Sequence, residues 1–255
     1  MNPNAKVRLI CFPYAGGSAS VFHPWLQWLP EWVELHAVQL PGRAERIVEP
    51  HINTMQEYIS GVKAELIALT DKPYLLFGHS MGALAAFEAL VMVHQTRLPM
   101  PERCVFSAAL APNRPRRMKP ISELPQQAFI EELKKLNGTP EQVFNSPGLI
   151  DFCLPYIRAD FSVVERFETG FLGQLPSHST VIYGSEDKMT EQDMQEWQSF
   201  FSNEIKITAY IGDHFFIHDD ENIKAVIHEL LYGVLPLTSK TNREDRGVTS
   251  DCVLT

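Results

Sequence analysis

The sequence has few cysteines, and they stand far apart. Its 255 residues include four of them, Cys11, Cys104, Cys153 and Cys252. None of their spacings is typical of metal ligands, so no metal site is expected. Cys11 and Cys104 fall in apolar runs, which favours buried free thiols in a reducing compartment over disulfides. We therefore expect a cytoplasmic protein.

Long apolar runs are also lacking. None approaches the ~18 residues that a membrane-spanning helix needs. Residues 1–6 show no charged region, apolar core and cleavage site, so we expect no signal peptide. Residues 252–255 formally fit a prenylation box, but Thr255 is not a usual final residue for that modification. No membrane association is expected.

Positive charge is the third shortage. The sequence contains 22 lysines and arginines against 31 aspartates and glutamates, a net charge of −9. This balance argues against a general nucleic-acid-binding protein. Hydrophobic residues make up 45% and charged residues 21%, which are ordinary globular values. The chain is long enough for one large α/β domain with a full core.

Apolar runs and helical periodicities alternate along most of the chain. Strands are predicted at 7–12, 32–40, 73–77, 103–110, 179–183 and 205–211. Helices are predicted at 54–70, from the end of the third strand to about 96, at 126–136, 147–167, after 190, and at 222–234. Such alternation predicts a mostly parallel sheet with helices on both faces.

The alternation stops in the middle of the chain. Residues 111–120 contain three prolines and four basic residues, which a central strand cannot accommodate. The following residues, to about 175, contain helical patterns only. We expect a helical lid at about 115–175, inserted in a single domain that spans 1–237. Residues 238–255 are polar without periodicity, and we expect a disordered tail there.

One stretch predicts a nucleophile. Residues 78–82 read Gly-His-Ser-Met-Gly, directly after a buried strand and before an alanine-rich helix. This order is typical of a nucleophile elbow, in which Ser80 lies at the tip of a strained turn. The backbone N–H of Met81, at the helix N-terminus, would then stabilise an oxyanion.

A glycine pair after the first strand predicts the second oxyanion donor. Residues 12–17 read Phe-Pro-Tyr-Ala-Gly-Gly, and in hydrolases of this type the loop after an early strand supplies that donor. We assign it to the N–H of Ala15, with Tyr14 as the weaker candidate.

A serine nucleophile needs a base and an orienting carboxylate. Asp187 follows the strand at 179–183 and His214 follows the strand at 205–211, so both lie at the edge of the sheet that carries Ser80. His218 is the closest rival for the base, and Glu186 and Asp213 are rivals for the carboxylate. His79 lies in the elbow itself and is expected to point away.

Two further expectations concern less distinctive residues. Arg43, Glu45 and Arg46 form a charged loop, which is more often a solvated turn than a site. The phenylalanines of the lid are each expected to pack between helices rather than to line a chamber; they are residues 129, 144, 152 and 161.

The sequence resembles a known family, the type II thioesterases of non-ribosomal peptide and polyketide synthases. The resemblance spans roughly residues 7–235 and rests on six segments: Phe-Pro-Tyr-Ala-Gly-Gly (12–17), Leu-Pro-Gly-Arg (40–43), the elbow (78–82), Asn-Gly-Thr-Pro (137–140), Pro-Tyr-Ile-Arg-Ala-Asp (155–160) and Gly-Asp-His-Phe-Phe (212–216). One segment departs from the family: residues 107–110 read Ser-Ala-Ala-Leu where the family usually has a Ser-Gly-Arg-like sequence.

The resemblance implies an α/β-hydrolase fold and a proofreading hydrolase. Such an enzyme removes stalled or wrong acyl groups from the phosphopantetheine arm of carrier proteins. The resemblance implies Ser80, Asp187 and His214 as the triad, and the N–H groups of Met81 and Ala15 as the oxyanion hole. It implies no cofactor, because the phosphopantetheine belongs to the substrate.

Several alternatives stay open. A general carboxylesterase or an acyltransferase could use the same fold, and so could a module that binds an acyl carrier without turnover. Carrier proteins are typically acidic, so a basic cluster beside the lid is a candidate docking surface, although a solvated loop is an equal possibility. The cluster comprises Arg114, Arg116, Arg117 and Lys119. A monomer is the default expectation.

Overall fold

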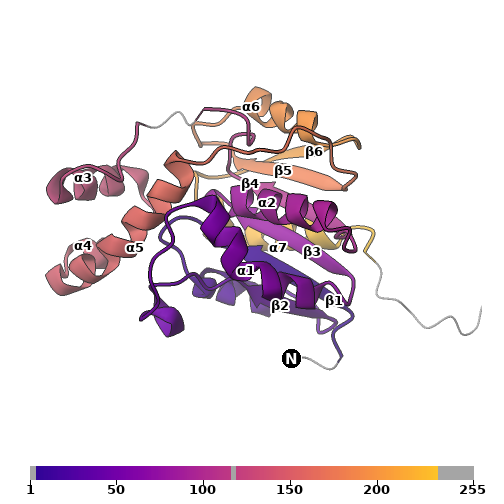
Figure 1. Ribbon diagram of the computed structural model, residues 1–255, viewed down its shortest axis with the longest axis horizontal. Coiled ribbons are helices and arrows are strands. Elements are labelled where there is room, and N and C mark those ends of the chain that lie inside the picture. The colour runs from indigo at the N-terminus through magenta and orange to yellow at the C-terminus, as the bar shows by residue number, and fades with distance from the viewer. Residues whose placement is uncertain (1–3, 116–118, 235–255) are drawn as a thin grey trace, which may run out of the picture.

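The computed structural model describes residues 4–115 and 119–234, and these form a parallel α/β structure (Figure 1). Six strands pair in the order β2-β1-β3-β4-β5-β6, and every pairing is parallel. The strands are β1 Val7–Phe12, β2 Val33–Ala37, β3 Tyr74–His79, β4 Arg103–Ser107, β5 Ser179–Gly184 and β6 Lys206–Tyr210. The predicted fold class is confirmed. The expected tail at 238–255 and Cys252 lie outside the described residues.

Two strands end three residues earlier than predicted. The second ends at Ala37 instead of residue 40, and the fourth ends at Ser107 instead of residue 110. Ala108 has a φ of 51°, which no strand residue can adopt, so the chain turns out of the sheet immediately after Ser107.

Helices cover both faces of the sheet. One face carries α1 Met55–Leu69, α2 Met81–Gln95 and α6 Glu191–Gln195 with η3 Glu196–Phe200. The other carries η1 Ala19–Gln27, η4 Phe216–His218 and α7 Asp220–Leu231. Successive residues of β1 alternate between the two cores, with Leu9 and Cys11 in one and Ile10 and Phe12 in the other, as the period of a strand requires.

The segment expected to form a helical lid, called the lid below, lies between β4 and β5 in the chain and beside the sheet in space (Figure 1). It consists of α3 Gln126–Leu136, α4 Glu141–Phe144 and α5 Pro147–Glu165. These helices have a small apolar core of their own, which includes Phe129, Leu133 and Ile157. The helix α3 ends at Asn137, which adopts a left-handed φ of 58°.

The strand order places a crevice beside β1. From β1 the chain moves outward to β2 and then returns to the other side of β1 to form β3. In open parallel sheets, ligands bind outside the carboxyl ends of the strands where the order reverses. The loop after β1 and the elbow after β3 meet at this point.

Three further findings concern expectations from composition. Cys11, Cys104 and Cys153 are buried free thiols. Over residues 4–115 and 119–234, no helix is both long and apolar enough to cross a bilayer. The same residues hold no cluster of potential ligands that would suit a metal ion.

Candidate active site

Ser80 lies on a strained turn between β3 and α2. Its φ is 55° and its ψ is −116°, a conformation that costs a residue with a side chain of order 1–3 kcal/mol. The surrounding structure holds this turn, since the Ser80 N–H donates to the Ser107 carbonyl at 2.7 Å. Strain of this kind concentrates at active sites, where it exposes the reacting group.

Gly78 and Gly82 allow three elements to converge on this turn. A Cβ on Gly78 would lie 2.0 Å from the Gly82 carbonyl oxygen. A Cβ on Gly82 would lie 2.0 Å from the carbonyl oxygen of Phe12, at the end of β1. Both obstacles are backbone atoms, so no side-chain movement could relieve them. The glycines of the motif are therefore required by packing.

His214 and Asp187 are paired beside the elbow. The His214 Nδ1 lies 2.7 Å from the Asp187 Oδ2, and the Asp187 side chain is only 8% exposed. Because an ionised carboxylate can only accept, Nδ1 carries the proton of the bond in the neutral ring and Nε2 remains a base. Ser80, Asp187 and His214 line one cavity of about 370 Å³.

Two of the rivals for these positions, Asp213 and His218, have other contacts. Asp213 accepts from the N–H of Phe215 at 2.8 Å and from the side-chain amide of Asn137 at 3.4 Å. His218 Nε2 lies 3.0 Å from the hydroxyl of Tyr14. Asp213 thus caps the turn next to His214, and His218 supports the loop after β1.

The loop after β1 forms a tight turn against the cavity. Gly17 N–H donates to the Tyr14 carbonyl at 2.9 Å, and Gly16 has a φ of +82°. This is a type II turn, which needs a glycine at its third position. Ala15 and Met81, the two predicted oxyanion donors, both line the cavity with Ser80.

The cavity lies between the sheet and the lid. Polar and charged side chains form one part of its wall: Lys135, Asn137, Thr139, Glu186, Lys188 and Asp213. Apolar side chains form another: Leu84, Leu110, Leu133, Leu136, Ile157, Phe161, Val164 and Met189. The expectation that each lid phenylalanine only packs between helices is wrong for Phe161, which both lines the cavity and contacts Phe129 at a ring separation of 6.0 Å.

His79 has a role that the sequence did not indicate. It is absent from the cavity wall and fully buried, with its Nδ1 2.8 Å from the Ser107 hydroxyl. Its ring lies 5.2 Å from the His214 ring. Burial, and then the neighbouring His214 and His218, hold the pKa of His79 well below its ordinary value. The His79 ring is therefore uncharged, and the His214 ring packs against it.

Arg43 corrects a second expectation. It is not part of a solvated turn, since it is only 4% exposed and donates two hydrogen bonds of 2.6 Å to the fully buried Asp160 of α5. Glu45 is exposed, and Arg46 pairs with Glu49 at 2.5 Å. Both partners, Arg43 and Asp160, lie in segments that carry the family resemblance, which was the available signal for them.

The predicted docking cluster is only partly described. Arg114 forms an ion pair with Glu196 at 2.6 Å, and Lys119 is exposed. Arg116 and Arg117 lie outside the described residues.

Comparisons with known proteins show the family to which the chain belongs. The thioesterase domain family matches residues 7–231. The gramicidin S biosynthesis protein GrsT of Aneurinibacillus migulanus is 35% identical over 222 residues, which are 87% of this chain and 87% of that protein.

Two solved structures are similar in fold and sequence. ClbQ from the colibactin NRPS/PKS pathway superposes with a TM-score of 0.83 at 27% identity, over 90% of this chain and 97% of that one. YbtT, a type II thioesterase from the yersiniabactin NRPS/PKS biosynthetic pathway, gives 0.79 at 26% identity, over 90% and 93%. The chain belongs to the thioesterase family, as a type II thioesterase of peptide and polyketide synthase systems that cleaves thioesters with a Ser-His-Asp triad.

Proposed function

We propose that this enzyme removes aberrant or stalled acyl groups from the phosphopantetheine arm of carrier proteins, and that Ser80, His214 and Asp187 form its triad. One observation carries the assignment: the strained Ser80 and the His214–Asp187 pair line the same cavity. The mixed polar and apolar wall suits a substrate with an amide-rich arm and an acyl chain.

The triad acts through a covalent intermediate. His214 Nε2 takes the hydroxyl proton of Ser80 as its oxygen attacks the thioester carbonyl carbon. The carbon–sulfur bond then breaks, and His214 returns the proton to the departing pantetheine thiol. Water, deprotonated by His214, attacks the carbonyl carbon of the acyl-serine. The bond to the Ser80 oxygen then breaks, His214 returns the proton to that oxygen, and the carboxylic acid is released. Asp187 holds the imidazole in the required tautomer and stabilises its positive charge.

The oxyanion is stabilised by backbone groups. The N–H of Met81 and the N–H of Ala15 donate to the carbonyl oxygen when it becomes negatively charged. Loss of one such donor typically costs on the order of 10²–10³ in rate. The residues of the chain provide every group for this reaction, and the phosphopantetheine arrives with the substrate.

Two finer points belong to the same proposal. The partner is an acidic carrier protein, which Lys119 and the neighbouring basic residues would meet at the start of the lid. If the charge reversal Lys119→Glu lowers turnover of a carrier-bound thioester but not of a free one, docking at Lys119 is supported. If the variant turns over both substrates as the wild type does, docking there is refuted.

The buried free thiols of Cys11, Cys104 and Cys153 favour a reducing compartment such as the cytoplasm.

The decisive experiment compares three substrates with the wild-type enzyme and Ser80→Ala. The substrates are an acylated, phosphopantetheinylated carrier protein, a free acyl thioester and a p-nitrophenyl ester. We expect the fastest release from the carrier protein, and its loss in Ser80→Ala. Turnover of the small ester alone would instead indicate a general esterase, and carrier binding without release would indicate a binding module.

A further inference from the structure

The lid and the oxyanion loop meet at a single carboxylate. Asp160 lies on α5, and its Oδ2 accepts from the backbone N–H of Gly16 at 2.7 Å. Gly16 directly follows Ala15 in the tight turn after β1. A Cβ on Gly16 would lie 3.4 Å from Ile157, so α5 packs directly on this turn. The lid is thus bonded to the loop that carries an oxyanion donor.

Arg43 completes the connection. Its two terminal nitrogens each donate to one oxygen of Asp160 at 2.6 Å, and one of them also donates to the Gly17 carbonyl at 2.8 Å. The ring of Tyr156, also on α5, lies 4.4 Å from the guanidinium carbon. One guanidinium therefore binds the lid helix and the turn simultaneously, with the fork geometry that lysine lacks.

The hydrogen bonds of Asp160 favour its ionised form. Burial raises the pKa of its carboxyl, while the hydrogen bonds and charge of Arg43 and the N–H of Gly16 oppose that shift. The Asp160 side chain is the acceptor in all three of its hydrogen bonds. A protonated carboxyl would have to give up one of them, so the geometry favours the carboxylate.

These contacts determine which way the turn faces. The central peptide of this turn joins Ala15 to Gly16. Its orientation is what distinguishes a type II turn, as here, from a type I turn, in which the same peptide faces the opposite way. The Asp160 carboxylate holds the N–H of that peptide, and the Gly17–Tyr14 hydrogen bond closes the turn. The backbone on both sides of Ala15 is therefore restrained.

We infer that Asp160 and Arg43 are positioning residues for the oxyanion hole, and that they make the alignment of the Ala15 N–H depend on the seating of α5 against the turn. This inference rests on the proposed function, because it assumes that Ser80 forms the oxyanion and that Ala15 binds it. Asp160 and Arg43 themselves act through the turn and not on the substrate.

The test separates oxyanion binding from ordinary binding. An alkyl trifluoromethyl ketone forms a tetrahedral oxyanion on a catalytic serine, whereas the corresponding trifluoromethyl alcohol fills the same space without reacting. Inhibition constants for both would be measured with Asp160→Asn and Arg43→Lys. We expect affinity for the ketone to fall about 10- to 100-fold, less than the full loss of a donor, and affinity for the alcohol to change less than about twofold. In parallel, kcat should fall while KM stays constant.

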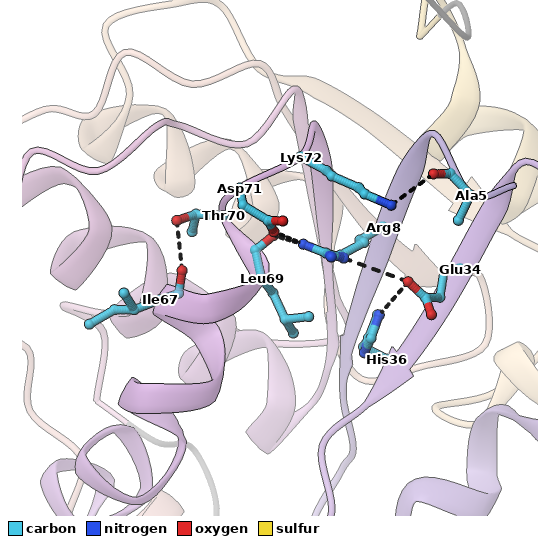
Figure 2. A network of polar contacts seen from close by, with 9 residues as sticks. All are labelled: Ala5, Arg8, Glu34, His36, Ile67, Leu69, Thr70, Asp71 and Lys72. Carbon is cyan, nitrogen blue, oxygen red and sulfur yellow. Dashed lines mark hydrogen bonds and ion pairs between the residues drawn. The ribbon is translucent and has the colours of Figure 1, made fainter. Parts of the chain in front are cut away.

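A matched control exists at the opposite edge of the sheet. Arg8, near the amino end of β1, is 5% exposed and lies among carboxylates and carbonyls, as Figure 2 shows. It contacts Asp71, pairs with Glu34 at 3.6 Å and donates to the Leu69 carbonyl at 3.0 Å. Arg8→Lys weakens a buried arginine network just as Arg43→Lys does, but far from the cavity. It should lower the melting temperature and leave the ketone-to-alcohol affinity ratio unchanged.

Each outcome has one meaning. A selective loss of ketone affinity in Arg43→Lys, absent in Arg8→Lys, supports the inference, and this pair suffices if Asp160→Asn does not fold. An unchanged ketone-to-alcohol ratio in Arg43→Lys would show that the ion pair only stabilises the fold, and the inference would be wrong. Ser80→Ala distinguishes the proposed function, since ketone affinity that survived this change would refute the serine mechanism itself.

Discussion

At the scale of single residues, the site depends on which carboxylate reaches His214. Asp187 and Asp213 both precede the histidine in the chain, and Asp213 is its direct neighbour. In the structure, Asp187 contacts His214. Asp213 instead accepts hydrogen bonds from Phe215 and Asn137. Adjacency in sequence is a poor guide here, because a side chain cannot easily fold back onto the ring that follows it.

Because Asp187 contacts His214 and Asp213 does not, the same substitution at these two positions should have different effects. Asp187→Asn should lower kcat by on the order of 10⁴, because an amide in place of the carboxylate favours the wrong imidazole tautomer. Asp213→Asn keeps an acceptor for the Phe215 N–H and should change kcat by less than about tenfold. Steady-state kinetics on a free acyl thioester would measure both. A larger effect of the Asp213 change would reverse the assignment.

At the scale of elements, the position of Ser80 depends on how closely α2 approaches β1 and β3. Gly82 is the point of contact, because any side chain there would overlap the backbone of Phe12 and Pro13. Gly61 offers a contrast. It lies within α1, is exposed, and a Cβ placed on it would meet nothing within 4 Å.

The two glycines should therefore respond in opposite directions to alanine. Gly61→Ala should raise the free energy of unfolding by roughly 0.5–1 kcal/mol, since alanine is the better residue in a helix interior. Gly82→Ala should lower it by about 1–3 kcal/mol or more through overpacking, and should displace Ser80 and reduce kcat. Urea unfolding and kinetics on both variants provide the measurement. Equal stability changes would contradict the packing account.

At the scale of the whole molecule, burial of uncharged histidine makes stability depend on pH. His79 is fully buried and its pKa lies well below the ordinary value, chiefly because of burial. Above about pH 6.5, the usual value for an unfolded chain, the ring is neutral in both states and its contribution is fully present. As the pH falls below that value, only the unfolded state takes up the proton, so stability is lost.

The free energy of unfolding should accordingly fall between pH 7.5 and 5.5. The His79 contribution to this slope is at most about 1.4 kcal/mol per pH unit. His79→Gln should remove that part of the slope, whatever its effect on absolute stability. His94→Gln, at an exposed position of α2, serves as the control and should keep the wild-type slope. A His79→Gln variant with an unchanged slope would show that His79 takes up its proton equally in the folded and the unfolded state, and the burial argument would be wrong.

Local patterns were enough to predict most elements of this protein and to propose three residues of its candidate site. Apolar runs predicted the positions of the strands, and helical periodicity predicted the helices at 54–70 and after 190. In the structure, Thr54 with Glu57 and Thr190 with Asp193 form capping boxes at the starts of these two helices. Ser80 stood out because a nucleophile elbow is a contiguous motif. Asp187 and His214 followed from the rule that parallel strands end at one edge of the sheet.

Contacts between distant segments were decided only by the tertiary structure. Asp160 lies 117 residues from Arg43 and 144 from Gly16, and nothing in the local sequence of any of the three indicates that they meet. The same holds for His79, which the elbow motif hides and whose ring packs on His214. Sequence patterns report which face of an element is buried, because burial follows local periodicity. They do not report which buried polar groups find one another, because that depends on how lid, loop and sheet fold together.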